Sequence, residues 1–326
     1  MRPCFLISLP RAGSTLLQRL MAQHPKIRTT GEPWMLLPFV YALRPKGSRA
    51  EYSHHSMSTG FREFVEGLPK GEDTYFREVG TMTERLHASR AGEGFDYFLD
   101  KTPRYHLILK ELTRMFPEGR FVVLHRNPLA VVASILNTWT RGRFRLKSNA
   151  LDVYEGPLSI HDFVMNAPTH LLEVHYESLA ASPEATLRRV TEFLGLEPLA
   201  RAELPNDDAV KRAALGDKRG IHQYRKVTTA SVEAWPTSFA SPIRRAWARR
   251  YLAYLGEARL QRMGYDVREL QGLLARGGFN GGQCARDLVD FNARLLPLLL
   301  APSMTFQRVV RRKEVRLEYR YRWTSS

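Results

Sequence analysis

Cysteine is scarce in this chain: among 326 residues there are two, Cys4 and Cys284. They lie far apart in the sequence and indicate no disulfide framework, which suits a reducing compartment. Long apolar runs are lacking as well. The nearest candidate, residues 295–301, contains Pro297 and is shorter than the roughly 20 apolar residues of a membrane span. The first apolar strand begins almost at Met1 and leaves no room for a signal peptide, so we expect a cytoplasmic protein.

Acidic residues are also under-represented. The chain has 33 Asp and Glu against 49 Lys and Arg, a formal net charge of +16. A positive net charge of this size attracts nucleic acid, anionic lipid or a highly phosphorylated small molecule. A basic surface that only keeps the protein in solution would give the same excess of basic residues. No zinc finger or aromatic RNA-binding motif is visible, so nucleic acid is not expected. His54 and His55 have no evident third ligand and suggest a surface loop within residues 44–60 rather than a metal site.

What is present is an alternation of apolar strands and helices. A first strand over residues 4–9 leads through a short loop into a helix over 14–23, and a second strand over 120–125 leads into a helix from Pro128. A third strand is predicted over 171–175. This pattern predicts an α/β fold, a P-loop-like doubly wound parallel sheet flanked by helices, with ligands at the carboxyl ends of the strands.

The C-terminal part has a different pattern. Apolar and charged residues alternate strictly over 315–323, which favours a half-buried edge strand. A contact with a membrane or a partner through 303–326 is the alternative. We therefore predict one domain over 1–266 and a C-terminal helical and strand-like extension over 267–326.

The loop after the first strand has the composition of an anion site. Backbone N–H groups at a turn with a glycine, next to two hydroxyls at the start of a helix, bind phosphate-like groups. An ordinary strand–turn–helix without a ligand is the alternative. The loop lacks the first Gly and the Gly-Lys-Ser/Thr ending of an ATP loop. The candidate contacts are Arg11, Ala12, Gly13, Ser14 and Thr15.

Two further patterns point to a second anion site. Arg126 follows the second strand and Ser134 lies eight positions later in the next helix, while Lys101 follows the apolar stretch 95–99. Two phosphate sites without a metal motif imply a bisphosphorylated nucleotide held by Arg, Lys and hydroxyl groups. The alternative for Arg126 is a structural ion pair with Glu177 or Asp100.

Together these motifs resemble the sulfotransferases that use 3′-phosphoadenylyl sulfate (PAPS). The run 10–16, followed by His24-Pro25 and Gly31-Glu32, is most similar to the tyrosylprotein and related bacterial branch. Residues 176–179 with Pro183 resemble the later Tyr-Glu-x-Leu…Pro element. Gly264-Tyr265 resembles the usual end of the catalytic core, so the resemblance covers about residues 4–266.

The resemblance implies a role for each matched residue. Glu32 would be the catalytic base, with His106 ranked below it, and Arg11 and Lys101 would stabilise the leaving oxygen together with the N–H groups of the first loop. Arg126 and Ser134 would bind the 3′-phosphate. Residues near the nucleotide would be Tyr176, Lys226 and Ser231.

The function implied is transfer of a sulfuryl group from PAPS to an acceptor hydroxyl, without a metal. Carbohydrate, peptide tyrosine, lipid and small molecules stay open as acceptors. A P-loop kinase for small molecules, or a non-catalytic basic protein that binds nucleic acid or membrane, are the alternatives.

Overall fold

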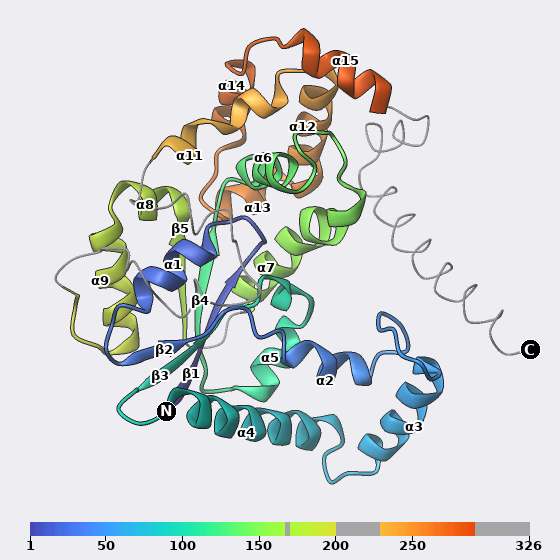
Figure 1. The fold of residues 1–326 in the computed structure, drawn as a ribbon, viewed down its shortest axis with the longest axis vertical. Helices are drawn as coiled ribbons and strands as arrows, with labels where there is room; N and C mark the ends of the chain where they lie inside the picture. Colours follow the sequence, from blue (N-terminus) through green and yellow to red (C-terminus); the bar gives the residue numbers. More distant parts are fainter. Residues whose placement is uncertain (167–169, 200–228, 291–326) are drawn as a thin grey trace, which may run out of the picture.

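The computed structural model describes residues 1–166, 170–199 and 229–290 (Figure 1). Five parallel strands form one sheet in the order β2-β3-β1-β4-β5. The strands are β1 (Arg2–Ser8), β2 (Ile27–Thr29), β3 (Tyr97–Asp100), β4 (Arg120–His125) and β5 (Leu171–His175). The α/β class and the parallel sheet are therefore confirmed. Because β1 lies at the centre of the sheet, the loop that follows it is flanked by the ends of β3 and β4.

Helices connect and cover these strands. They begin with α1 (Ser14–Met21), α2 (Leu36–Ala42), α3 (His54–Glu66), α4 (Glu72–Ala91), η1 (Pro103–Leu107), α5 (Leu109–Met115) and α6 (Pro128–Trp139). They continue with η2 (Lys147–Asn149), the π-helix η3 (Leu151–Glu155), α7 (Gly156–Met165), α8 (Tyr176–Ala181) and α9 (Pro183–Leu194). After the next gap come α11 (Ala230–Glu233), η4 (Trp235–Phe239), α12 (Pro242–Leu255), α13 (Glu257–Arg262), α14 (Val267–Ala275) and α15 (Gly281–Asp290). No helix of the described ranges is both long and apolar enough to cross a membrane.

The central strand is buried on both faces, as its continuous apolar sequence predicts. Phe5 and Ile7 pack into a core with α5, α6, α7 and α12, whereas Cys4 and Leu6 pack on the other face with α1, α8 and α9 (Figure 1). Burial raises the pKa of the Cys4 thiol to about 12, so this cysteine stays protonated and acts as a small apolar residue.

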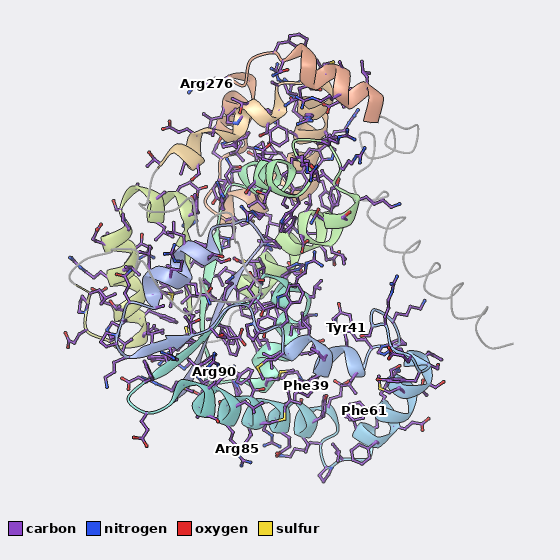
Figure 2. All side chains as sticks on the ribbon, in the orientation of Figure 1. Phe39, Tyr41, Phe61, Arg85, Arg90 and Arg276 are labelled. Carbon is purple, nitrogen blue, oxygen red and sulfur yellow. The ribbon has the colours of Figure 1, made fainter. Side chains whose placement is uncertain are left out.

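The region 44–60 differs from the loop that its polar composition predicts. Ser53 caps α3 by accepting a hydrogen bond from the Ser56 backbone N–H, and the His54 ring is buried and donates to the Arg44 carbonyl oxygen at 2.9 Å. Phe39 and Tyr41 of α2 and Phe61 of α3 lie in the same part of the molecule (Figure 2). The Phe61 ring packs edge-on against Tyr75 of α4, with the ring centres 5.3 Å apart. A helix cap and aromatic contacts therefore hold α3, and neither is evident from the polar composition of residues 44–60.

A buried ion pair joins two of the helices after residue 241, and the same arginine also contacts the preceding part of the chain. Arg244 of α12 donates to both carboxylate oxygens of Asp287 in α15, at 2.8 and 2.7 Å, and also to the carbonyl oxygens of Gly142 and Ser238. The buried guanidinium of Arg244 thus has a charged partner and hydrogen-bond acceptors, without which its burial would be costly. The boundary at 266/267 stays a prediction, and the segment 303–326 lies outside the described residues.

Candidate active site

The backbone of the loop between β1 and α1 is in the left-handed region at two positions. Arg11 and Gly13 have φ angles of 69° and 98°. A Cβ at position 13 would lie 2.3 Å from Cδ2 of Tyr176, so only glycine allows the tyrosine ring to pack on the loop. Ser14 and Thr15 follow as the first residues of α1. Their backbone N–H groups belong to the first turn of a helix, where the helix dipole favours an anion.

Lys101 and Glu32 form an ion pair beside this loop. Lys101 comes directly after β3 and is 1% exposed, and its Nζ lies 2.7 Å from Glu32 Oε1 and 3.4 Å from Thr15 Oγ1. The Glu32 side chain is 12% exposed, which is unlike a solvated loop carboxylate. The predicted base, the predicted cation and a hydroxyl of the first loop are thus brought together by contacts between segments 69 and 86 residues apart.

Arg126 lies on the other side of the same loop. Its guanidinium donates to the carbonyl oxygens of Arg11 and Ser231, each at 2.9 Å, and lies 4.2 Å from the centre of the Tyr176 ring. The Tyr176 hydroxyl is 2.6 Å from Ser231 Oγ. Arg11 Nε donates to Ser134 Oγ at 3.2 Å. These contacts make neighbours of the five predicted nucleotide-binding residues Arg11, Arg126, Ser134, Tyr176 and Ser231. Ser134, the predicted partner of Arg126 in binding the 3′-phosphate, contacts Arg11. Lys226 lies outside the described residues.

The carboxylates considered as structural partners of Arg126 bind other groups. Glu177 accepts hydrogen bonds from the Asn127 backbone N–H at 2.9 Å and from the Tyr265 hydroxyl at 3.0 Å. Asp100 accepts from Tyr105 at 3.0 Å. Burial and the neighbouring Glu177 charge hold the pKa of Tyr265 well above its usual range, so Tyr265 keeps the proton that it donates. Glu177 thus fixes the backbone next to Arg126, a role that sequence reasoning missed.

The residue before Arg126 also takes part in a contact that fixes the position of Arg126. His125 donates to Glu173 at 2.9 Å, and Arg262 donates to the same carboxylate at 2.9 Å. The hydrogen bond from His125 is the largest cause that lowers the pKa of Glu173 to about 2. Since His125 and Glu173 lie on the adjacent strands β4 and β5, their pair fixes the strand end that carries Arg126.

His106, the lower-ranked candidate base, is placed differently. Its side chain is completely buried, and its Nε2 lies 3.1 Å from Asp152 Oδ1, while Arg104 contacts the other oxygen of Asp152 at 2.6 Å. Asp152 belongs to the π-helix η3. The His106 ring is thus held by Asp152 and has no solvent exposure, whereas the Glu32 carboxylate is 12% exposed.

A family model places the chain among known proteins. The model described as the sulfotransferase family matches residues 3–200, more than half of the chain. The chain therefore belongs to the sulfotransferase family, which confirms the resemblance found in the sequence.

Individual relatives agree with this placement. The nodulation protein NoeE of Sinorhizobium fredii is 29% identical over 260 residues, which cover 72% of this chain and 60% of that protein. Protein-tyrosine sulfotransferase 1 of Danio rerio is 25% identical over 214 residues, covering 64% of this chain and 57% of the relative. The chain thus spans about three fifths of the length of these relatives.

A solved structure shows the same fold. The sulfotransferase domain from the curacin biosynthetic pathway superposes with a TM-score of 0.51 and 17% identity, and the match covers 82% of this chain and 99% of that domain.

Proposed function

We propose that this chain transfers the sulfuryl group of PAPS to an acceptor hydroxyl and releases adenosine 3′,5′-bisphosphate (PAP). One observation carries the proposal: Arg126 and the Lys101–Glu32 pair flank the same glycine loop from the ends of β4 and β3. A nucleotide with phosphate groups at the 3′ and 5′ positions of its ribose fits two cationic sites that lie beside one loop.

The nucleotide would lie across the loop. Its 5′-phosphosulfate would bind the N–H groups of residues 12–15 and the guanidinium of Arg11, and its 3′-phosphate would bind Arg126 and Ser134. The packing of Tyr176 on Gly13 and its hydrogen bond to Ser231 support a place for these two residues beside the nucleotide. The cationic side chains and the N–H groups supply the positive charge, so the proposal includes no metal.

The chemistry is a direct displacement at sulfur. Glu32 takes the proton of the acceptor hydroxyl, and the oxygen of that hydroxyl bonds to sulfur. The bond between sulfur and the bridging phosphate oxygen breaks, and its electron pair stays on that oxygen. Arg11, Lys101 and the loop N–H groups stabilise this developing charge because the fold orients them before the reaction begins. The enzyme holds the acceptor and PAPS in the geometry for direct transfer, so the proposed reaction forms no covalent enzyme intermediate.

The acceptor is proposed at the level of a hydroxyl group on a carbohydrate, peptide tyrosine, lipid or small molecule. The relatives named protein-tyrosine sulfotransferase support a hydroxyl as the group that is modified. Contact of residues 303–326 with a membrane or partner and the cytoplasmic location both remain proposals. A P-loop kinase is set aside because the chain belongs to the sulfotransferase family.

The test is transfer of labelled sulfur from PAPS. We expect the purified chain to release PAP and to move the label onto at least one member of a panel of phenols, saccharides, tyrosine peptides and alcohols. ATP with Mg²⁺ and the same panel is the control and should give no phosphoryl transfer. Label that stays on the nucleotide with every acceptor would contradict the proposal and favour the non-catalytic alternative.

A further inference from the structure

Trp34 has a backbone conformation that a bulky side chain rarely adopts. Its φ angle is 57°, in the left-handed region that favours glycine. Such a residue persists only where its surroundings compensate for the strain, and strained residues gather at functional sites. Trp34 lies two positions after Glu32, so the strain occurs beside the proposed base.

Two hydrogen bonds hold Trp34 in this conformation. Its backbone N–H donates to Thr102 Oγ1 at 3.2 Å, and its indole Nε1–H donates to Glu32 Oε2 at 3.2 Å. Thr102 directly follows Lys101, the residue that binds the other oxygen of Glu32 at 2.7 Å. Trp34 therefore joins Glu32 to the end of β3, and it does so through Glu32 itself and through the residue next to Lys101.

The two oxygens of Glu32 consequently have different partners. Oε1 has a short, charged contact with Lys101, whereas Oε2 has a longer contact with a neutral donor. A carboxylate oxygen has two lone pairs, so Oε2 can accept from the indole and from an acceptor hydroxyl at once. A hydroxyl within hydrogen-bond reach of Oε2 must also lie close to the indole nitrogen.

We propose that Trp34 is a positioning residue, which holds Oε2 of Glu32 as the atom that receives the acceptor proton. Its indole forms one wall of the position where the acceptor hydroxyl binds. The inference rests on the proposed function, because it assigns an atom and a neighbour to the base of that reaction. It predicts that loss of the indole N–H lowers turnover and does not change the affinity for the nucleotide.

The first experiment separates turnover from nucleotide binding. In Trp34→Phe the ring remains and the donor is lost, so we expect kcat to fall by about 10- to 100-fold, as a misplaced catalytic group does. The kinetic assay uses whichever panel acceptor the wild-type protein modifies. The dissociation constant of PAP should change less than about twofold, a limit set by the absence of any nucleotide contact in the proposal. Trp139→Phe, at the exposed end of α6, is the matched control and should keep both values.

The second experiment does not depend on activity. The chain has five tryptophans, and the indole ¹⁵N–¹H signal of Trp34 is the one that disappears in Trp34→Phe. In Glu32→Gln this signal should shift, because its charged acceptor becomes a neutral amide, while the other indole signals stay in place.

The outcomes separate the two proposals. An unmoved Trp34 signal in Glu32→Gln, or wild-type kcat in Trp34→Phe, would overturn the inference about Trp34. A shifted signal in Glu32→Gln, combined with no turnover of any acceptor by the wild-type protein, would overturn the proposed function but support the hydrogen bond between Trp34 and Glu32.

Discussion

The Glu32→Gln protein is expected to lose turnover by about 10²- to 10⁴-fold, the contribution of a positioned base, and to bind PAP as tightly as the wild type. An amide keeps the size of the side chain and an oxygen that can accept from Lys101, but it cannot take a proton from the acceptor. The measurement is kcat from PAP release together with the dissociation constant of PAP from calorimetry. Glu84→Gln, on the exposed face of α4, is the control and should change neither value.

Two results would count against this role. Turnover within a few-fold of the wild type would remove Glu32 as the base. A large loss of PAP affinity would show that the Glu32–Lys101 pair serves to hold the first loop, and the proton would then need another acceptor.

Replacing Arg126 with Ala should weaken PAP by about 2 to 5 kcal/mol, the cost of removing one partner of a buried charge pair, which is roughly 30- to several-thousand-fold in affinity. Adenosine 5′-monophosphate, which lacks the 3′-phosphate, should lose much less. The reason is geometric: Arg126 is 7% exposed and is fixed by two carbonyl oxygens and the Tyr176 ring, so its charge is oriented before the nucleotide binds.

Matched variants separate charge from shape. Arg126→Lys keeps the charge but not the planar fork, and it should recover only part of the PAP affinity. Arg85→Ala, on the exposed face of α4 (Figure 2), should behave as the wild type. Equal losses for PAP and for the 5′-monophosphate in Arg126→Ala would assign Arg126 to loop structure instead of the 3′-phosphate.

The sequence predicted those parts of the site that lie at the ends of buried strands. Arg126 and Lys101 each follow an apolar run, and the glycine loop follows another, so strand periodicity and the parallel arrangement were enough to bring them to one edge of the sheet. Ser231 was placed by resemblance, and its contacts with Arg126 and Tyr176 agree with that placement.

Other parts have no local pattern. Tyr265 reaches Glu177 across 88 residues, because the segment after α13 meets the end of β5, where His175 Nε2 lies 3.0 Å from the Met263 carbonyl oxygen. The strained Trp34 is held by Thr102 from a separate strand end. The strand β2 has three residues, too few for an alternation to appear. Contacts of this kind follow from tertiary packing, which single-sequence patterns do not encode.

The measurement closest to the central claim is the melting temperature of the whole chain with PAP, with adenosine 5′-monophosphate, and with ATP and Mg²⁺. A ligand that binds the native state alone raises the melting temperature according to its affinity. Two cationic sites on one loop predict the largest rise with PAP, a smaller rise with the 5′-monophosphate, and no advantage for ATP with Mg²⁺. A rise with PAP no greater than that with the 5′-monophosphate would contradict the account.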